Sequence, residues 1–133
     1  MFKREERLQW KEVRFLTKKR QIFHQWLLSI FYVEQYPNRH YHQFSYHIPI
    51  LVSKRAVVRH KVKRILISHL EKLLPTLNFS WKYYKGFISL NKWRLEQLLA
   101  ILEKKDSNQL KEYLEKENTK TFTFFSQSLW KKQ

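Results

Sequence analysis

The stretch YHIPILVSKRAVVRHKVKRILISHLEKLL, residues 46–74, guides our interpretation of the whole chain. It begins with the β-branched and aromatic residues of a strand and continues with helical spacing from about residue 56. Six cations and no acid fall within residues 53–64, where the two elements meet. The predicted helix has an apolar stripe of Val58, Val62, Ile65, Leu66, His69 and Leu73, and an opposite side of His60, Lys61, Arg64 and Ser68. A helix with an apolar back and a cationic front suits the phosphate backbone of nucleic acid.

Part of this stretch, VSKRAVVRHKVKR (residues 52–64), resembles the signature of the bacterial ribonuclease P protein subunit. In that family a strand ending in Ser-Lys-Lys leads through a short turn into Ala-Val-x-Arg-Asn-Arg-x-Lys-Arg on a helix. Residues 52–55 match the first part, and residues 56–59 with Lys63 and Arg64 match the second. Two differences stand out: His60 and Lys61 replace Asn and Arg, and a short part of the turn, usually including a Gly, is missing after Arg55.

The resemblance implies an α+β fold in which helices pack on a small mixed four-stranded sheet. The family shares this fold with the second domain of a ribosomal protein of the small subunit. Its order of elements is α-β-β-β-α-β-α, and its β-α-β crossover is left-handed, where chain order alone would predict a right-handed one. The resemblance extends more weakly over residues 7–104. We predict residues 1–104 to form the RNA-binding domain and residues 105–133 to form a C-terminal extension.

The composition favours a single folded domain with an anionic partner. The chain has 133 residues, of which 43% are hydrophobic and 17% aromatic, enough to build a core. Its 27 Lys and Arg outnumber 11 Asp and Glu, giving a net charge of +16 that lies almost entirely in residues 1–104. Nucleic acid is the favoured partner and an acidic membrane surface the second. No apolar run reaches bilayer length, no signal peptide is evident, and there is no Cys. Of the two anionic partners we expect nucleic acid and not a membrane, and we expect a cytoplasmic location.

Hydrophobic periodicity and turn signals predict the elements along the chain. We expect a helix at 8–20 and strands at 21–24, 27–35, 44–52 and 81–90. Further helices are expected at 56–74 and 92–104, the latter capped by Asn91. Pro49 predicts an edge or bulged strand, and Gly86 a bulge or a close backbone approach. In the extension we expect a short helix at 108–118 and then an aromatic segment, which either packs on the domain or contacts RNA or a partner.

The sequence offers no evident catalytic apparatus of its own, and we predict no catalytic or metal-binding side chains. A two-metal nuclease needs several converging carboxylates, and the acids here look scattered over helix surfaces. His40, His42 and His47 lie in one loop-to-strand region, but His-x-His is weak evidence for a metal or catalytic site. His69 falls on the apolar stripe and is better interpreted as a hydrogen-bonded core histidine.

The family resemblance accounts for this absence, because in ribonuclease P the RNA subunit carries the chemistry with bound Mg²⁺. It implies that this chain holds the 5′ leader of precursor tRNA and braces the RNA subunit, its two expected partners. The residues expected to bind the RNA subunit are Lys54, Arg55, Arg59, His60, Lys61, Lys63 and Arg64. The leader groove would lie between the first helix and the sheet, with candidates Phe15, Lys19, Phe23, Phe31, Tyr32 and Ser53.

Three other functions fit parts of the pattern. A ribosomal or other structured-RNA-binding protein without processing activity shares the charge and the aromatics, but does not predict the basic block across a strand–helix junction. A DNA-binding regulator would need a helix just before the basic one, where a strand is predicted, so we expect no DNA partner. An autonomous metal-dependent nuclease is disfavoured by the scattered carboxylates.

Overall fold

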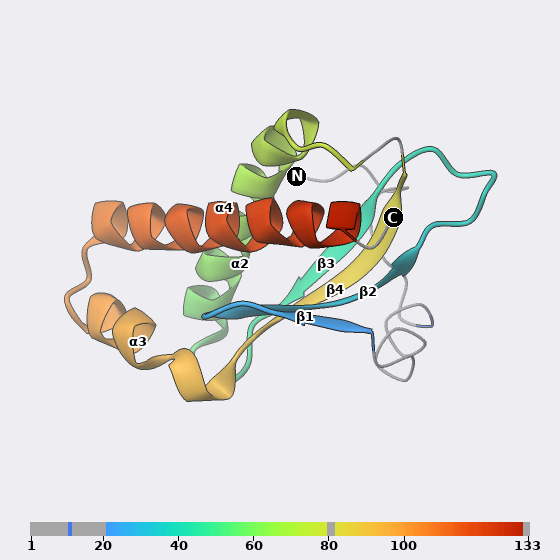
Figure 1. The fold of residues 1–133 in the computed structure, drawn as a ribbon. Coiled ribbons are helices and arrows are strands. Elements are labelled where there is room, and N and C mark those ends of the chain that lie inside the picture. The colour runs from blue at the N-terminus through green and yellow to red at the C-terminus, as the bar shows by residue number, and fades with distance from the viewer. Residues whose placement is uncertain (1–10, 12–20, 80–81, 132–133) are drawn as a thin grey trace.

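A mixed β-sheet with helices packed on one face forms the framework of the fold (Figure 1). The computed structural model describes residues 11, 21–79 and 82–131. In this part of the chain the strands are β1 (Ile22–His24), β2 (Leu28–Glu34), β3 (Gln43–His47) and β4 (Tyr84–Leu90). Their order is β1-β2-β4-β3, with β4 antiparallel to β2 and parallel to β3. The helix predicted at residues 8–20 lies outside the described residues.

Helices follow the third and fourth strands, as the sequence predicts. Helix α2 (Ala56–Leu73) connects the parallel strands β3 and β4, and continues as the 3-10 turn η2 (Leu74–Thr76). After β4 come the 3-10 turn η3 (Lys92–Arg94), α3 (Glu96–Glu103) and α4 (Ser107–Lys131). The predicted fold class, a small mixed four-stranded sheet with packed helices, is confirmed. Among the described residues no helix is both long and apolar enough to cross a bilayer.

Two local predictions need correction. The strand predicted at 44–52 ends at His47, because Pro49 has no N–H to donate; a turn follows, closed by the bond from the Val52 N–H to the Pro49 carbonyl (3.0 Å). The strand does lie at an edge of the sheet, as Pro49 predicted. Asn91 does not cap a helix with its side chain. That side chain instead holds the turn between β1 and β2.

The core lies between one face of the sheet and the helices α2 and α4. The sequence left the core face of β2 open; the structure buries Leu28, Ile30 and Tyr32 on this face. Strand β4 passes so close to β3 that a Cβ on Gly86 would lie 2.6 Å from the Phe44 ring. Gly86 therefore marks a close approach inside a regular ladder, the second of its two predicted roles.

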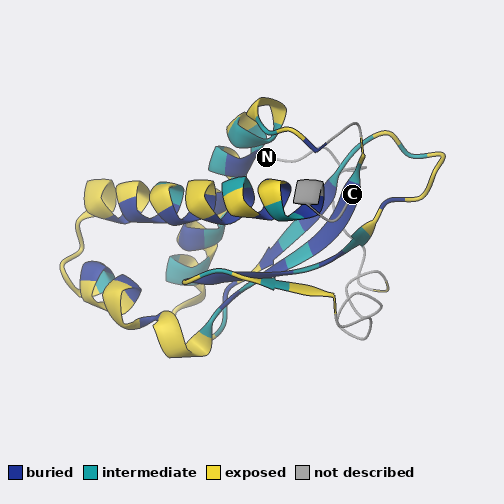
Figure 2. Cartoon of the chain, in the orientation of Figure 1, coloured by how far each residue is buried: buried dark blue, intermediate teal, exposed yellow. Residues whose placement is uncertain are grey.

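Helix α4 is longer than the sequence predicted and belongs to the core. The predicted short helix at 108–118 and separate aromatic segment form one helix of 25 residues. Its inner side is buried against the sheet and its outer side is exposed (Figure 2). The ring of Phe125, fully buried, lies 5.0 Å from that of Tyr32 and 5.5 Å from that of Phe23. Burial of this apolar side stabilises a helix that Thr and Phe residues favour only weakly.

A buried polar contact joins α4 to both β3 and α2. The Tyr46 hydroxyl donates to Asn118 Oδ1 (2.6 Å), and Asn118 Nδ2 donates to His69 Nδ1 (3.0 Å). His69 thus has the structural role predicted for it, and burial lowers its pKa. Because buried polar groups cost free energy unless they are paired, this network fixes the position of α4 on the sheet edge.

Candidate nucleic-acid interface

The junction between β3 and α2 concentrates positive charge at the amino end of a helix. Ser53 Oγ accepts a hydrogen bond from the Arg55 N–H (3.1 Å), and α2 begins at the next residue. The first turn of α2 contains no acidic residue, and Arg55 at its N-cap makes no side-chain cap. Helix dipoles favour anions at this end, so the cations here lower stability unless an anion binds.

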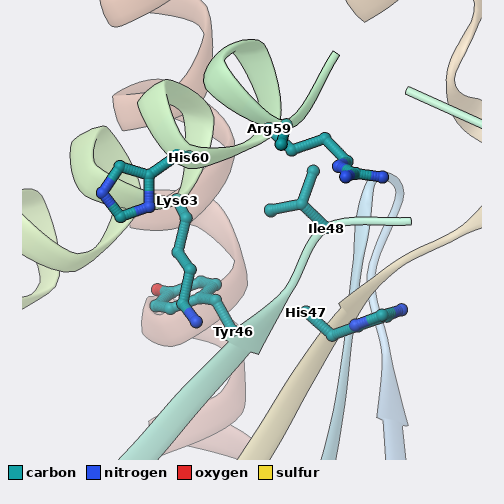
Figure 3. A pocket seen from close by; sticks show the side chains of 7 residues that line it. Tyr46, His47, Ile48, Arg59, His60 and Lys63 are labelled. Carbon is teal, nitrogen blue, oxygen red and sulfur yellow. The ribbon is translucent and has the colours of Figure 1, made fainter. Parts of the chain in front are cut away.

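An open cleft of about 230 Å³ lies between the first half of α2 and the end of β3 (Figure 3). On the helix side its residues are spaced i, i+3, i+4 and i+7, which places them on one face. The lining residues are Tyr46, His47, Ile48, Ala56, Arg59, His60 and Lys63. We call this the α2–β3 cleft.

The cleft presents positive charge without any carboxylate in its lining. In Figure 3, Lys63 extends from α2 toward Tyr46 and Arg59 reaches over Ile48. A guanidinium can bind a phosphate through two parallel hydrogen bonds, and an ammonium acts as a compact charge. The lining is partly apolar, because it includes the largely buried side chain of Ile48. This arrangement fits a phosphodiester of a nucleic acid backbone.

The structure brings together some of the predicted RNA-binding residues and separates others. Arg59, His60 and Lys63 line the α2–β3 cleft, and Arg64 is exposed one turn after His60. Lys54 and Arg55 are exposed at the junction itself. Lys61 lies apart from the cleft, because its Nζ donates to Ser107 Oγ (2.7 Å) at the start of α4.

The described candidates for the leader groove lie on different sides of the sheet. Phe23 and Tyr32 lie on the core side, where both pack against Phe125. Phe31 lies on the opposite side of the sheet, because successive strand residues point to opposite faces. Ser53 is half-buried in the turn before α2. Phe15 and Lys19 lie outside the described residues.

The side of the sheet that carries Phe31 has aromatic residues that sequence reasoning missed. The Phe31 ring lies 6.1 Å from that of Phe87 on β4, and Phe87 lies 6.0 Å from the ring of His47 on β3. His47 also lines the α2–β3 cleft, so the aromatic row leads to the cationic cleft. The alternation in YKGFISL could have identified Phe87, since it is two residues from Lys85 and Ser89 and shares their face.

The loop before β3 contains His42, whose ring is packed inside the fold. No group of three or more potential metal ligands occurs in the described residues. His42 is packed among aromatic rings, with Phe79 at 4.6 Å and Phe44 at 5.6 Å. Its Nδ1 accepts a hydrogen bond from the Tyr84 N–H (3.1 Å), which tethers the loop to β4.

Acidification is expected to destabilise the fold through His42. Burial lowers the pKa of His42 from 6.5 to about 4, so the unfolded chain takes up a proton at a higher pH than the folded one. The contribution of His42 to the free energy of unfolding is fully present above pH 6.5. It is lost as the pH falls from 6.5 to 4, by at most about 3 kcal/mol. Urea denaturation across this range measures the loss. A His42→Phe variant should be less stable at neutral pH but show a flatter pH dependence; an unchanged slope would contradict this role.

Comparison with known proteins identifies the fold. No protein-family model matches the chain, and no curated protein matches it. Among solved structures, it is similar to the ribonuclease P protein of Staphylococcus aureus, with a TM-score of 0.53 and 13% sequence identity. The alignment covers 73% of this chain and 94% of that chain. The chain has a ribonuclease P protein-like fold. At this identity the similarity concerns the fold alone.

Proposed function

We propose that this chain is the protein subunit of a ribonuclease P ribonucleoprotein, which assists a catalytic RNA in removing the 5′ leader from precursor tRNA. The observation that carries the proposal is the position of Arg59 and Lys63 in the α2–β3 cleft of a fold of this kind. The signature-like residues 52–64 span the end of the turn after β3 and the first half of α2. They differ from the family pattern in that β3 ends at His47, before Ser53 and Lys54.

In this proposal the cleft binds phosphates of the RNA subunit, and Lys54, Arg55 and Arg64 extend that contact over the exposed surface. Phosphate contacts from Arg and Lys position a protein on its RNA without reading the sequence. The row of His47, Phe87 and Phe31 would accept bases of the single-stranded leader, because aromatic faces stack on any base. The RNA subunit would bind the Mg²⁺ and carry out the cleavage, in the cytoplasm.

Reconstitution tests this proposal directly. The protein alone is expected to leave precursor tRNA uncut. Added to its cognate RNA subunit, it should lower the concentrations of magnesium and monovalent salt needed for 5′ cleavage, as followed by gel analysis of labelled precursor. Cleavage by the protein without RNA, or no effect on the RNA-catalysed reaction, would overturn the proposal.

Sequencing of the RNA that the protein retains from native lysate separates the proposal from its alternative. Enrichment of ribonuclease P RNA supports the processing role. Enrichment of ribosomal RNA would instead indicate a structured-RNA-binding protein with no processing activity, which has the same charge and the same cleft.

A further inference from the structure

Two exposed tryptophans lie at one end of the sheet, outside the α2–β3 cleft. Trp93, in η3, is 91% exposed, and Trp26, in the turn between β1 and β2, is 52% exposed. In Figure 2 the segment after β4 is coloured as exposed. Proteins usually bury large aromatic rings, so two that remain exposed to solvent indicate a binding surface. We name Trp26, Lys92, Trp93 and Arg94 the tryptophan corner.

Asn91 holds the two segments of the tryptophan corner together. Its Nδ2 donates to the carbonyl oxygens of Gln25 (2.7 Å) and Trp26 (3.0 Å), and its Oδ1 accepts from the Ser29 hydroxyl. Its backbone N–H donates to the Leu27 carbonyl (2.7 Å). The rings are therefore presented from a hydrogen-bonded base, which reduces the entropy lost when a ligand binds.

Positive charge surrounds both rings. The Arg94 guanidinium carbon lies 3.9 Å from the centroid of the Trp26 ring, a cation–π contact. Lys92 and Arg94 are exposed on either side of Trp93. Leu95, the next residue, is buried and anchors the segment in the core. The corner thus combines a free aromatic face with flanking cations.

We propose that the tryptophan corner is a second RNA-binding site, which stacks an unpaired base on Trp93 and holds the adjoining phosphates with Lys92 and Arg94. Single-stranded RNA is bound by aromatic platforms combined with cations. The flanking Lys92 and Arg94 favour this ligand over an apolar protein partner, for which desolvating both charges would be costly. The site uses other residues than the α2–β3 cleft and would act on any RNA with an unpaired base, whichever RNA the protein serves.

Binding of a short fluorescein-labelled oligoadenylate, followed by fluorescence anisotropy over a series of salt concentrations, tests the site. For Trp93→Ala the dissociation constant should rise roughly 5- to 150-fold, as expected for the loss of one stacked base. The salt dependence should be unchanged, because stacking displaces no counterions. In the double variant with Lys92→Gln and Arg94→Gln, the slope of log affinity against log salt should become shallower.

Matched variants make the result specific. Trp93→Phe keeps a flat ring and should retain most of the affinity, whereas Trp93→Leu keeps an apolar side chain without a ring face and should bind like Trp93→Ala. Phe124→Ala removes an exposed aromatic ring of α4 (48% exposed) and should bind like the unmodified protein.

Two outcomes would overturn the proposal. The first is unchanged oligoadenylate binding by Trp93→Ala; if that variant also sediments as a smaller species than the unmodified protein, the corner is a protein interface. The second is full affinity in Trp93→Leu, which would indicate a simple apolar contact. Circular dichroism confirms that each variant is folded. None of these measurements uses the ribonuclease P RNA subunit, so they succeed or fail independently of the proposed processing role.

Discussion

Under the proposed function, replacing Arg59, Lys63 and Arg64 together by glutamate is expected to weaken binding to the ribonuclease P RNA subunit on the order of 100-fold or more. Arg59 and Lys63 line the α2–β3 cleft, and Arg64 is exposed beside it. Each lost phosphate contact should also reduce the slope of log affinity against log salt by about 0.7–0.9. Filter binding at several salt concentrations measures both quantities.

The chain offers a control with the same change in net charge. Lys111, Lys116 and Lys120 are exposed on α4, away from the cleft, and their replacement by glutamate should leave the slope nearly unchanged. If both triple variants lost affinity equally, the effect would come from the total charge of +16 and not from the cleft. Unchanged binding by the Arg59, Lys63 and Arg64 variant would show that the assigned face is wrong.

Replacing Phe125 by alanine is expected to destabilise the protein by about 3–5 kcal/mol, a large part of the stability of a small domain. Its side chain is fully buried and contacts rings from β1, β2 and β4, so truncation leaves a cavity where α4 meets the sheet. Urea denaturation followed by circular dichroism measures the loss.

The neighbouring residue provides the matched control. Phe124 is 48% exposed on the outer side of α4, and Phe124→Ala should change stability by about 0.5 kcal/mol or less. Equal effects of the two substitutions would mean that α4 does not dock on the sheet through Phe125. Loss of stability in Phe125→Ala alone would establish that residues 107–131 belong to the folded core.

Most of the fold could be predicted because each element has a local signal. The alternation in residues 27–35 and the helical spacing in 56–74 depend only on the periods of strand and helix. Strand β3 lies at an edge of the sheet, one of the two alternatives predicted from Pro49, although Pro49 itself lies beyond the end of the strand. Asn91 stands at the N-cap position of η3, but its side chain does not cap the turn. Its side-chain partners, Gln25, Trp26 and Ser29, are distant in sequence and could not be predicted locally.

The candidate site likewise has a part that the sequence could predict and a part that it could not. The basic block at 53–64 is contiguous, so its charge and its position on a strand–helix junction could be recognised directly. The aromatic candidates could not be assigned to a surface, because Phe31 and Tyr32 are neighbours in the chain but lie on opposite faces of the sheet. Nothing local shows which of these faces a helix covers.

The sequence by itself therefore determined the type and order of the elements from β1 to α3 and the cationic character of α2. These follow from local periodicity and from charge, which need no knowledge of distant contacts. The tertiary structure alone decided that α4 continues through its aromatic segment and covers Tyr32. It also decided that Trp26 and Trp93 share one corner. Both depend on contacts between segments far apart in the chain, where burial and hydrogen bonding outweigh local propensity.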